Sequence, residues 1–174
     1  MKHIITWGGI LGLLLVAFSL GLYLLDMTES KPAQWINYII LGTIIFFGTK
    51  AKRTDLGGYL TYGQGLGTGA GIAFFGSVLV AIYTYLFFTV IDPGMLEELI
   101  LRVEDQMYEQ GNAPAEQIDM IMTYTRKFMQ PGPMAAMVVL TYSILGLVMS
   151  LIISAIVKKE DPSFEANFID ADLK

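Results

Sequence analysis

Long stretches without a charged side chain constrain this chain more than any other feature of its sequence. No Asp, Glu, Lys or Arg occurs in four separate stretches, each rich in aliphatic and aromatic residues. A helix needs about 20 predominantly apolar residues to cross a hydrocarbon core of about 30 Å at 1.5 Å per residue. The sequence therefore predicts an all-α membrane protein with four transmembrane helices, at residues 4–25, 33–49, 62–91 and 133–157.

The composition agrees with this class and argues against several others. Hydrophobic residues make up 54% of the chain and charged residues 16%, whereas a soluble domain usually has about 25% charged residues. The chain contains no cysteine, and its one histidine, His3, lies beside the N-terminus. We therefore expect no disulfide, no metal site within one chain and no cofactor. The net charge of −5 argues against nucleic acid as a partner, because phosphate binding needs a basic patch.

The first apolar stretch has two interpretations. Lys2 precedes it, as a basic residue precedes the apolar region of a cleaved signal peptide. Signal peptidase, however, needs small residues after that region, and the stretch ends in Leu22-Tyr23-Leu24-Leu25. We therefore interpret it as a retained helix. The second stretch is the shortest of the four, and Trp35 and Tyr38 at its start are typical of the membrane interface.

Residues 92–132 differ in character from the apolar stretches on either side. Asp92-Pro93 predicts a helix start and Gly111 a helix end, and Pro114 predicts the start of a second helix. Apolar residues recur at helical spacing in both segments: Met95, Leu96, Leu99, Ile100, Val103 and Met107, then Ile118, Ile121, Met122 and Thr125. We predict an acidic two-helix hairpin outside the membrane. Its apolar faces pack on each other or on the bilayer surface.

The distribution of Lys and Arg predicts the orientation. Seven of the eleven lie on the side that carries the termini, with a cluster at residues 50–53, and four lie on the other side. Because loops rich in Lys and Arg stay in the cytoplasm, we expect both termini and the tail, residues 158–174, to be cytoplasmic. The hairpin at 92–132 is then periplasmic. It carries eight acidic residues: Asp92, Glu97, Glu98, Glu104, Asp105, Glu109, Glu116 and Asp119.

Small residues recur every four positions in the membrane stretches. The third stretch has one such row at Gly63, Gly67 and Gly71 and another at Gly65 and Gly69. The last stretch has Gly146, Ser150 and Ser154, and the first has Gly8 and Gly12. In lipid this spacing lets two helix backbones approach closely. We predict that the rows pack within the bundle or against a partner, and that Ala70 and Ala73 lie on less important faces.

A dinucleotide-binding loop is the alternative interpretation of the glycines in the third stretch. Gly65-x-Gly67-x-x-Ala70 loosely fits that fingerprint. The fingerprint also requires a preceding strand and a later acidic residue, which are missing here. We therefore favour helix packing.

The sequence offers little to catalysis or ion transport. No ionisable residue lies within the four stretches, although ion-coupled transporters usually need one inside the membrane. Nucleophilic catalysis would need a Cys or a usable His. The acidic pairs Glu97-Glu98 and Glu104-Asp105 are adjacent, so they point about 100° apart on a helix and form a solvated face. We predict that the protein is not an enzyme.

The acidic tail contains two phenylalanines four residues apart, Phe164 and Phe168. They share one face if the tail is helical, and they then suit the groove of a protein partner.

The chain resembles the domain of unknown function 4199 family. The resemblance rests on the glycine-rich third stretch ending in Ile91-Asp92-Pro93, the segments Glu109-Gln110-Gly111 and Glu116-Gln117-Ile118, and the last stretch closing on Ile156-Val157-Lys158-Lys159. It implies a small four-span protein of the inner membrane of Gram-negative bacteria, and it implies no activity.

Two hypotheses for the function follow. The first is an accessory subunit that sits among membrane lipids and binds another membrane protein or a second copy of itself. The alternative is a small carrier or lipid-handling protein with a groove for an uncharged or zwitterionic molecule. A carrier should show a pocket between spans, and an accessory subunit should show closed packing.

Overall fold

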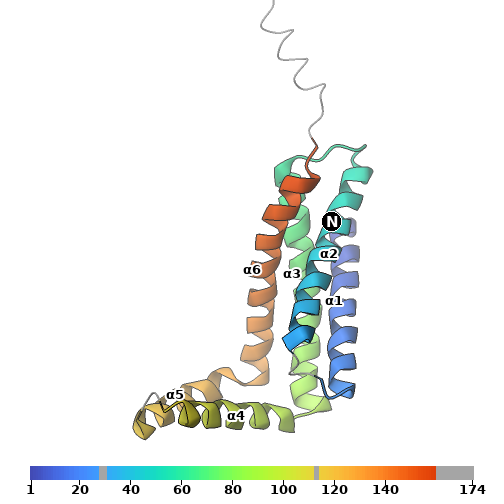
Figure 1. Ribbon diagram of the computed structural model, residues 1–174. Helices are drawn as coiled ribbons and strands as arrows, with labels where there is room; N and C mark the ends of the chain where they lie inside the picture. Colours follow the sequence, from blue (N-terminus) through green and yellow to red (C-terminus); the bar gives the residue numbers. More distant parts are fainter. Residues whose placement is uncertain (28–30, 112–113, 160–174) are drawn as a thin grey trace, which may run out of the picture. The chain divides into compact units, whose positions relative to one another are not determined.

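The computed structural model describes residues 1–27, 31–111 and 114–159, and within them the chain is all-α (Figure 1). Six α-helices and one π-helical turn, η1, occur there, with an isolated bridge between Leu60 and Lys159. The bounds are α1 (Lys2–Leu24), α2 (Lys31–Asp55), α3 (Tyr62–Leu86), η1 (Phe87–Ile91), α4 (Gly94–Gln110), α5 (Ala115–Phe128) and α6 (Pro131–Val157).

The chain divides into two compact units. We call the first the bundle; among the described residues it contains Met1–Leu79 and residues 142–159. The second, the hairpin unit, is Val80–Thr141. Helices α3 and α6 each contribute one part to each unit.

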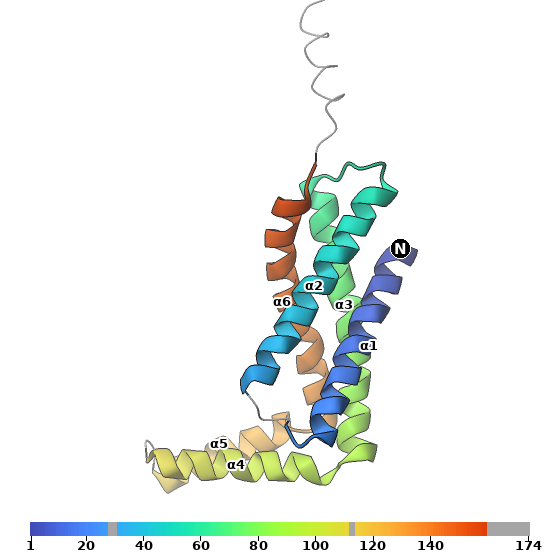
Figure 2. The ribbon, with the colours of Figure 1, turned by 45° about the vertical axis from the view of Figure 1, so that its right-hand side comes forward.

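In the bundle, α1, α2, the first part of α3 and the last part of α6 lie side by side (Figures 1 and 2). Helices α1 and α2 run antiparallel, because His3 at the start of α1 contacts Gly48 near the end of α2. Arg53 at the end of α2 donates a hydrogen bond to the carbonyl of Val157 at the end of α6. Apolar residues from all four helices form the core: Leu11, Leu15, Leu41, Ile45, Ile72, Ala73 and Ile153.

Within the residues that the structure describes, three segments are long and apolar enough to cross a membrane, which indicates a membrane protein. They are α1, the continuous stretch Tyr62–Ile91 and α6. Helix α2 is not among them, although its length is similar. Its first turns carry Trp35, Asn37 and Tyr38, and basic residues occupy its last turn, so its mean hydropathy is lower. The predicted span at residues 33–49, the second along the chain, therefore does not follow from length and composition alone.

The helix ends in the hairpin unit follow the local signals of the sequence. The Asp92 carboxylate accepts a hydrogen bond from the backbone N–H of Met95, 3.0 Å away, and so caps the first turn of α4 as predicted. Gly111 ends α4 with a φ of 59°, a left-handed conformation that glycine adopts without steric cost. The predicted helix start after Asp92 and the predicted helix end at Gly111 are confirmed.

The first two helices differ from their predicted stretches by a few residues, at Lys2–Leu24 and Lys31–Asp55, and the third and last stretches differ more informatively. The third stretch is not one uniform helix to residue 91, because α3 ends at Leu86 and a π-helical turn follows. The last span begins at Pro131, and not at residue 133. Prolines are tolerated in a first helical turn because its N–H groups have no partner within the helix. The Pro-Gly-Pro segment therefore opens α6.

Candidate functional site

A zipper of small residues joins α3 to α6 in the bundle. Three contacts repeat with a step of four residues on both helices and in opposite directions: Gly65 with Ser154, Gly69 with Ser150, and Ala73 with Gly146. A methyl group at Gly65 would lie 3.0 Å from Ser154 Oγ, and methyl groups at Gly69 and Gly146 would collide with Ser150 and Ala73. This close approach of two backbones is what the small-residue spacing predicts in lipid.

The hydroxyl groups of the serines in the zipper lie against glycine and not against an N–H or O–H hydrogen-bond donor. Ser150 and Ser154 are fully buried, and their hydroxyl oxygens have no hydrogen-bond partner within the described part of the chain. Each oxygen lies near the place where a Cβ of Gly69 or Gly65 would stand, which is the direction of a glycine Cα–H. Weak Cα–H···O contacts of this kind recur at helix–helix interfaces. The zipper therefore gives these hydroxyls electrostatic contact as well as close packing.

A second close contact brings α1 against α3 at three glycines. A methyl group at Gly12 would stand 2.9 Å from the carbonyl oxygen of Gly76, and one at Gly8 would stand 3.1 Å from that of Ile72. These neighbours are backbone atoms, which cannot move aside as a flexible side chain can. Gly48 of α2 meets side chains instead, since a methyl group there would lie 2.5 Å from Ile72 Cδ1 and 3.2 Å from the Trp7 ring.

The two glycine rows predicted in α3 have different surroundings. Gly65 and Gly69 belong to the zipper, and Gly71 lies against the side chain of Ile4 in α1. Gly63 and Gly67 are exposed, and no described atom lies within 4 Å of the place of a Cβ. Gly67 makes no contact inside the bundle because that side of α3 faces outward, and the alternative, a contact of Gly67 with a partner helix, stays a prediction.

Ala73 requires a further correction. The sequence placed it on a face of little importance, but its side chain is fully buried against Gly146. It continues the Gly65–Gly69 row by one more step of four residues. Gly48 and Gly76 gave no such periodic signal. Phe164 and Phe168, proposed to bind a partner, lie outside the described residues.

His3 joins α1 to α2 at the end of the bundle that carries the basic residues. Its Nε2 lies 2.8 Å from the carbonyl oxygen of Gly48, and its Nδ1 lies 3.0 Å from the Asp55 carboxylate. Both neighbours are acceptors, so the ring can donate to both only when both nitrogens carry a proton. His3 is therefore suited to hold two helix ends together.

In the hairpin unit, α4 and α5 close on a small apolar core. Ile100 of α4 and Ile118 and Met122 of α5 are buried at its centre. Leu96, Val103, Met107 and Met129 pack around them. Ile121 was expected on the same face but is partly exposed. The core thus uses only part of the apolar surface of α5.

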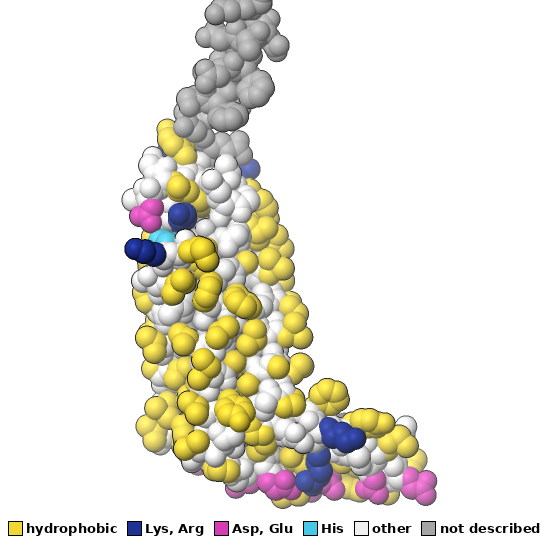
Figure 3. Space-filling view, turned by 180° about the vertical axis from the view of Figure 1, so that it is seen from behind, with side chains coloured by type: hydrophobic (Ala, Val, Ile, Leu, Met, Phe, Trp, Pro, Cys, Tyr) yellow, Lys and Arg dark blue, Asp and Glu magenta, His cyan; other side chains and the backbone are white. Residues whose placement is uncertain are grey.

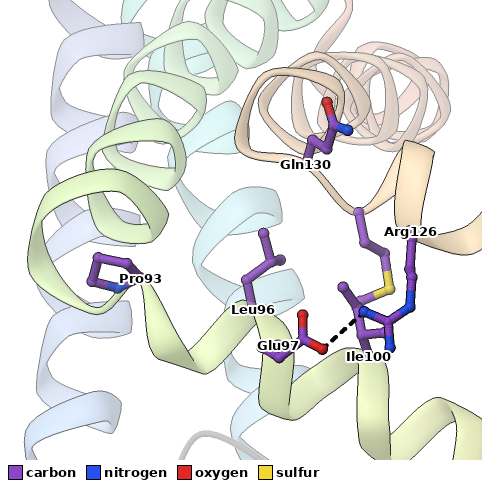
Figure 4. Close-up of a pocket in the computed structure, with 7 residues that line it drawn as sticks. Pro93, Leu96, Glu97, Ile100, Arg126 and Gln130 are labelled. Carbon is purple, nitrogen blue, oxygen red and sulfur yellow. Dashed lines mark hydrogen bonds and ion pairs between the residues drawn. The ribbon is translucent and has the colours of Figure 1, made fainter.

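Ion pairs cover one side of the hairpin core. Arg126 of α5 donates a 2.8 Å hydrogen bond to Glu97 of α4 (Figure 4). It also lies 3.6 Å from Glu104. The hydrogen bond and charge of Glu97, together with the charge of Glu104, raise the pKa of the Arg126 guanidinium. Tyr108 donates a longer hydrogen bond to Asp119 on the same two helices. These groups tie α4 to α5.

A shallow cavity of about 290 Å³ adjoins the Arg126–Glu97 pair (Figure 4). It is lined by Leu96, Glu97 and Ile100 of α4, by Arg126 of α5, and by Pro93, Met129 and Gln130. Ligand pockets usually have about 300–1,000 Å³ and bury most of the ligand. The charged groups of this cavity already satisfy each other, so they offer no free charge to a ligand.

The described residues contain no group of three or more His, Cys, Asp or Glu side chains placed to hold a metal ion. The described residues instead form close helix–helix contacts in the bundle and an apolar core covered by ion pairs in the hairpin unit.

Comparison with known proteins identifies the family. A family model described as a protein of unknown function (DUF4199) matches residues 6–159, from the first turns of α1 to the end of α6. No curated protein and no solved structure matches the chain. Because the match covers most of the chain, the protein belongs to the DUF4199 family.

Proposed function

We propose that this protein is an accessory subunit of the bacterial inner membrane that binds another membrane protein or a second copy of itself. The observation that carries the proposal is the closed packing of the bundle. A carrier needs space between spans for its cargo, whereas α3 has no room for a methyl group where it meets α1 and α6. The proposed role is therefore one of binding and not of catalysis.

The glycines of α3 that make no contact inside the bundle are the proposed contact with the partner. Gly63 and Gly67 are four residues apart on an exposed face, with open space around them. In lipid there is little gain from burying apolar side chains, so helices associate where small residues let their backbones approach. A partner helix lying on this row would repeat outside the bundle the contact that Gly65 and Gly69 make inside it.

The proposal includes α2 as the fourth span. Helix α2 runs beside α1, and its residues Leu41, Ile45 and Thr49 are fully buried. Four antiparallel crossings return the C-terminal end of α6 to the side of the N-terminus, in keeping with the Arg53–Val157 hydrogen bond. Basic residues gather at that end, which favours a cytoplasmic location for both termini and a periplasmic one for residues 92–132.

The test is purification of the tagged full-length protein in mild detergent, followed by mass spectrometry and measurement of its mass in solution. We expect a reproducible membrane-protein partner or a dimer. Gly67→Leu should lose it without a change in melting temperature, because the position is open within the bundle. Gly9→Leu, at an equally open glycine of α1, is the matched control and should keep it.

Two results would contradict the proposal. One is Gly67→Leu retaining the partner or dimer at the level of the wild type. The other is a monomer that co-purifies with one bound lipid or small molecule per chain, which would support the carrier instead.

A further inference from the structure

The hairpin unit has two chemically different sides. On one side Arg126 pairs with Glu97 and Glu104, and Tyr108 bonds to Asp119. In the view of Figure 3, acidic side chains line the lower edge of the hairpin and hydrophobic side chains lie along its upper edge. The ends of α3 and α6 that adjoin the hairpin, residues 80–86 and 131–141, belong to the same unit.

The apolar surface of α5 is wider than α4 can cover. Ile118 and Met122 are buried against α4. Met120, Tyr124 and Phe128, spaced four residues apart, are 63%, 59% and 67% exposed. At about 100° per residue these three form a stripe that turns away from the buried pair. We call them the outer stripe of α5. An exposed apolar stripe of this kind usually marks an interaction surface.

The connections of the hairpin keep it close to membrane-length helices. Helix α5 ends at Phe128 and α6 begins at Pro131, and on the other side η1 ends at Ile91 and α4 begins at Gly94. A few residues span at most about 10 Å. Both flanking helices are apolar and long enough to cross a bilayer. The hairpin therefore emerges directly at the membrane boundary, with no linker that would carry it into water.

We propose that the hairpin lies flat in the membrane interface, with the outer stripe of α5 among the lipid headgroups and upper acyl chains and the ion-paired side in water. An amphipathic helix with Trp, Phe or Leu on one face and charges on the other binds a bilayer in this way. Lys127, whose ammonium lies 6.0 Å from the centre of the Tyr124 ring, can reach the phosphates while its stem stays beside the stripe.

The charge distribution indicates which lipid this surface suits. Glu98, Asp105 and Glu116 are exposed on the hairpin, so its net charge opposes binding to anionic lipid. Burial of the outer stripe must then supply the attraction, and zwitterionic headgroups should suffice. The proposal concerns the hairpin alone and goes beyond the proposed function, since it is independent of the partner of the bundle.

The test uses spin labels on the full-length protein in nanodiscs of phosphatidylcholine. The chain has no cysteine, so Tyr124→Cys and, as a second site, Met120→Cys each give one labelled position. Asp105→Cys, exposed on α4, is the matched control. We expect labels at 124 and 120 to collide more with oxygen, which concentrates in lipid, and less with a water-soluble nickel chelate than the label at 105. This difference should persist in 0.5 M salt, where the Debye length falls to about 4 Å and attraction between exposed charges is largely screened.

Equal access of the nickel chelate to positions 124, 120 and 105 would overturn the proposal, because the stripe would then lie in water. Protection of 124 and 120 only after addition of a protein partner would also overturn it and assign the stripe to that partner. Loss of the oxygen preference in high salt would show that charge, and not apolar burial, holds the hairpin.

Discussion

The zipper between α3 and α6 predicts that exchanging the residues at positions 73 and 146 is tolerated better than either single substitution. Gly146→Ala places a methyl group onto the side chain of Ala73, which is fully buried. Overpacking of this kind typically costs about 1–3 kcal/mol, and the better helix propensity of alanine returns up to about 1 kcal/mol. Ala73→Gly in the same chain should relieve the collision, since it moves the one methyl group from α3 to α6.

The swap keeps the composition and the total helix propensity unchanged, so only packing differs. In a chain of this size 1 kcal/mol corresponds to roughly 2–4 °C in melting temperature. With the helix propensity subtracted in full, the net cost for Gly146→Ala is up to about 2 kcal/mol, so its melting temperature in mild detergent, monitored by circular dichroism, should fall by up to about 8 °C. The double variant should recover most of this loss, and the cycle should give a coupling of about 0.5–3 kcal/mol.

One single variant completes this cycle. Ala73→Gly alone should also destabilise, because it leaves a void and adds a flexible residue to a helix. The packing argument is refuted if the changes caused by Gly146→Ala and Ala73→Gly simply add in the double variant, because the two methyl positions would then not be coupled.

Three further predictions follow from the same contacts. Gly12→Ala should lower the melting temperature in detergent because the new methyl group would meet Leu79 and the carbonyl oxygen of Gly76 in α3, whereas the open Gly9→Ala should leave the melting temperature unchanged or raise it; equal melting temperatures of the two variants would contradict the α1–α3 contact. In intact cells, a cysteine at exposed Thr54 should be protected from an impermeant thiol reagent and one at exposed Glu109 should be labelled, and the reverse pattern would exclude the proposed topology. Arg126→Ala should speed hydrogen exchange in α4 and α5, more at low salt than at high salt, and leave the bundle unaffected, because exposed ion pairs are weak and screened.

Local signals in the sequence determined the secondary structure of this protein. The charge-free stretches, Asp92 as a helix cap and Gly111 as a helix end each act through the chain next to them, so they could be recognised without the fold. The family resemblance was also visible in the sequence and is confirmed by the match over residues 6–159. The small-residue spacing correctly indicated that glycines such as Gly65 and Gly69 meet another helix.

Only the tertiary structure decided which small residues are used. The rows that begin at Gly63 and Gly65 have the same spacing, but an offset of two residues turns the helix by about 200° and points them to opposite sides. The position of the neighbouring helix therefore decides which row is buried, and α6 lies on the side of Gly65. Gly48 and Gly76 could not be recognised for the same reason, since each is required by a residue of another helix. Likewise, the position of α4 decides that Met122 is buried and Ile121 is not.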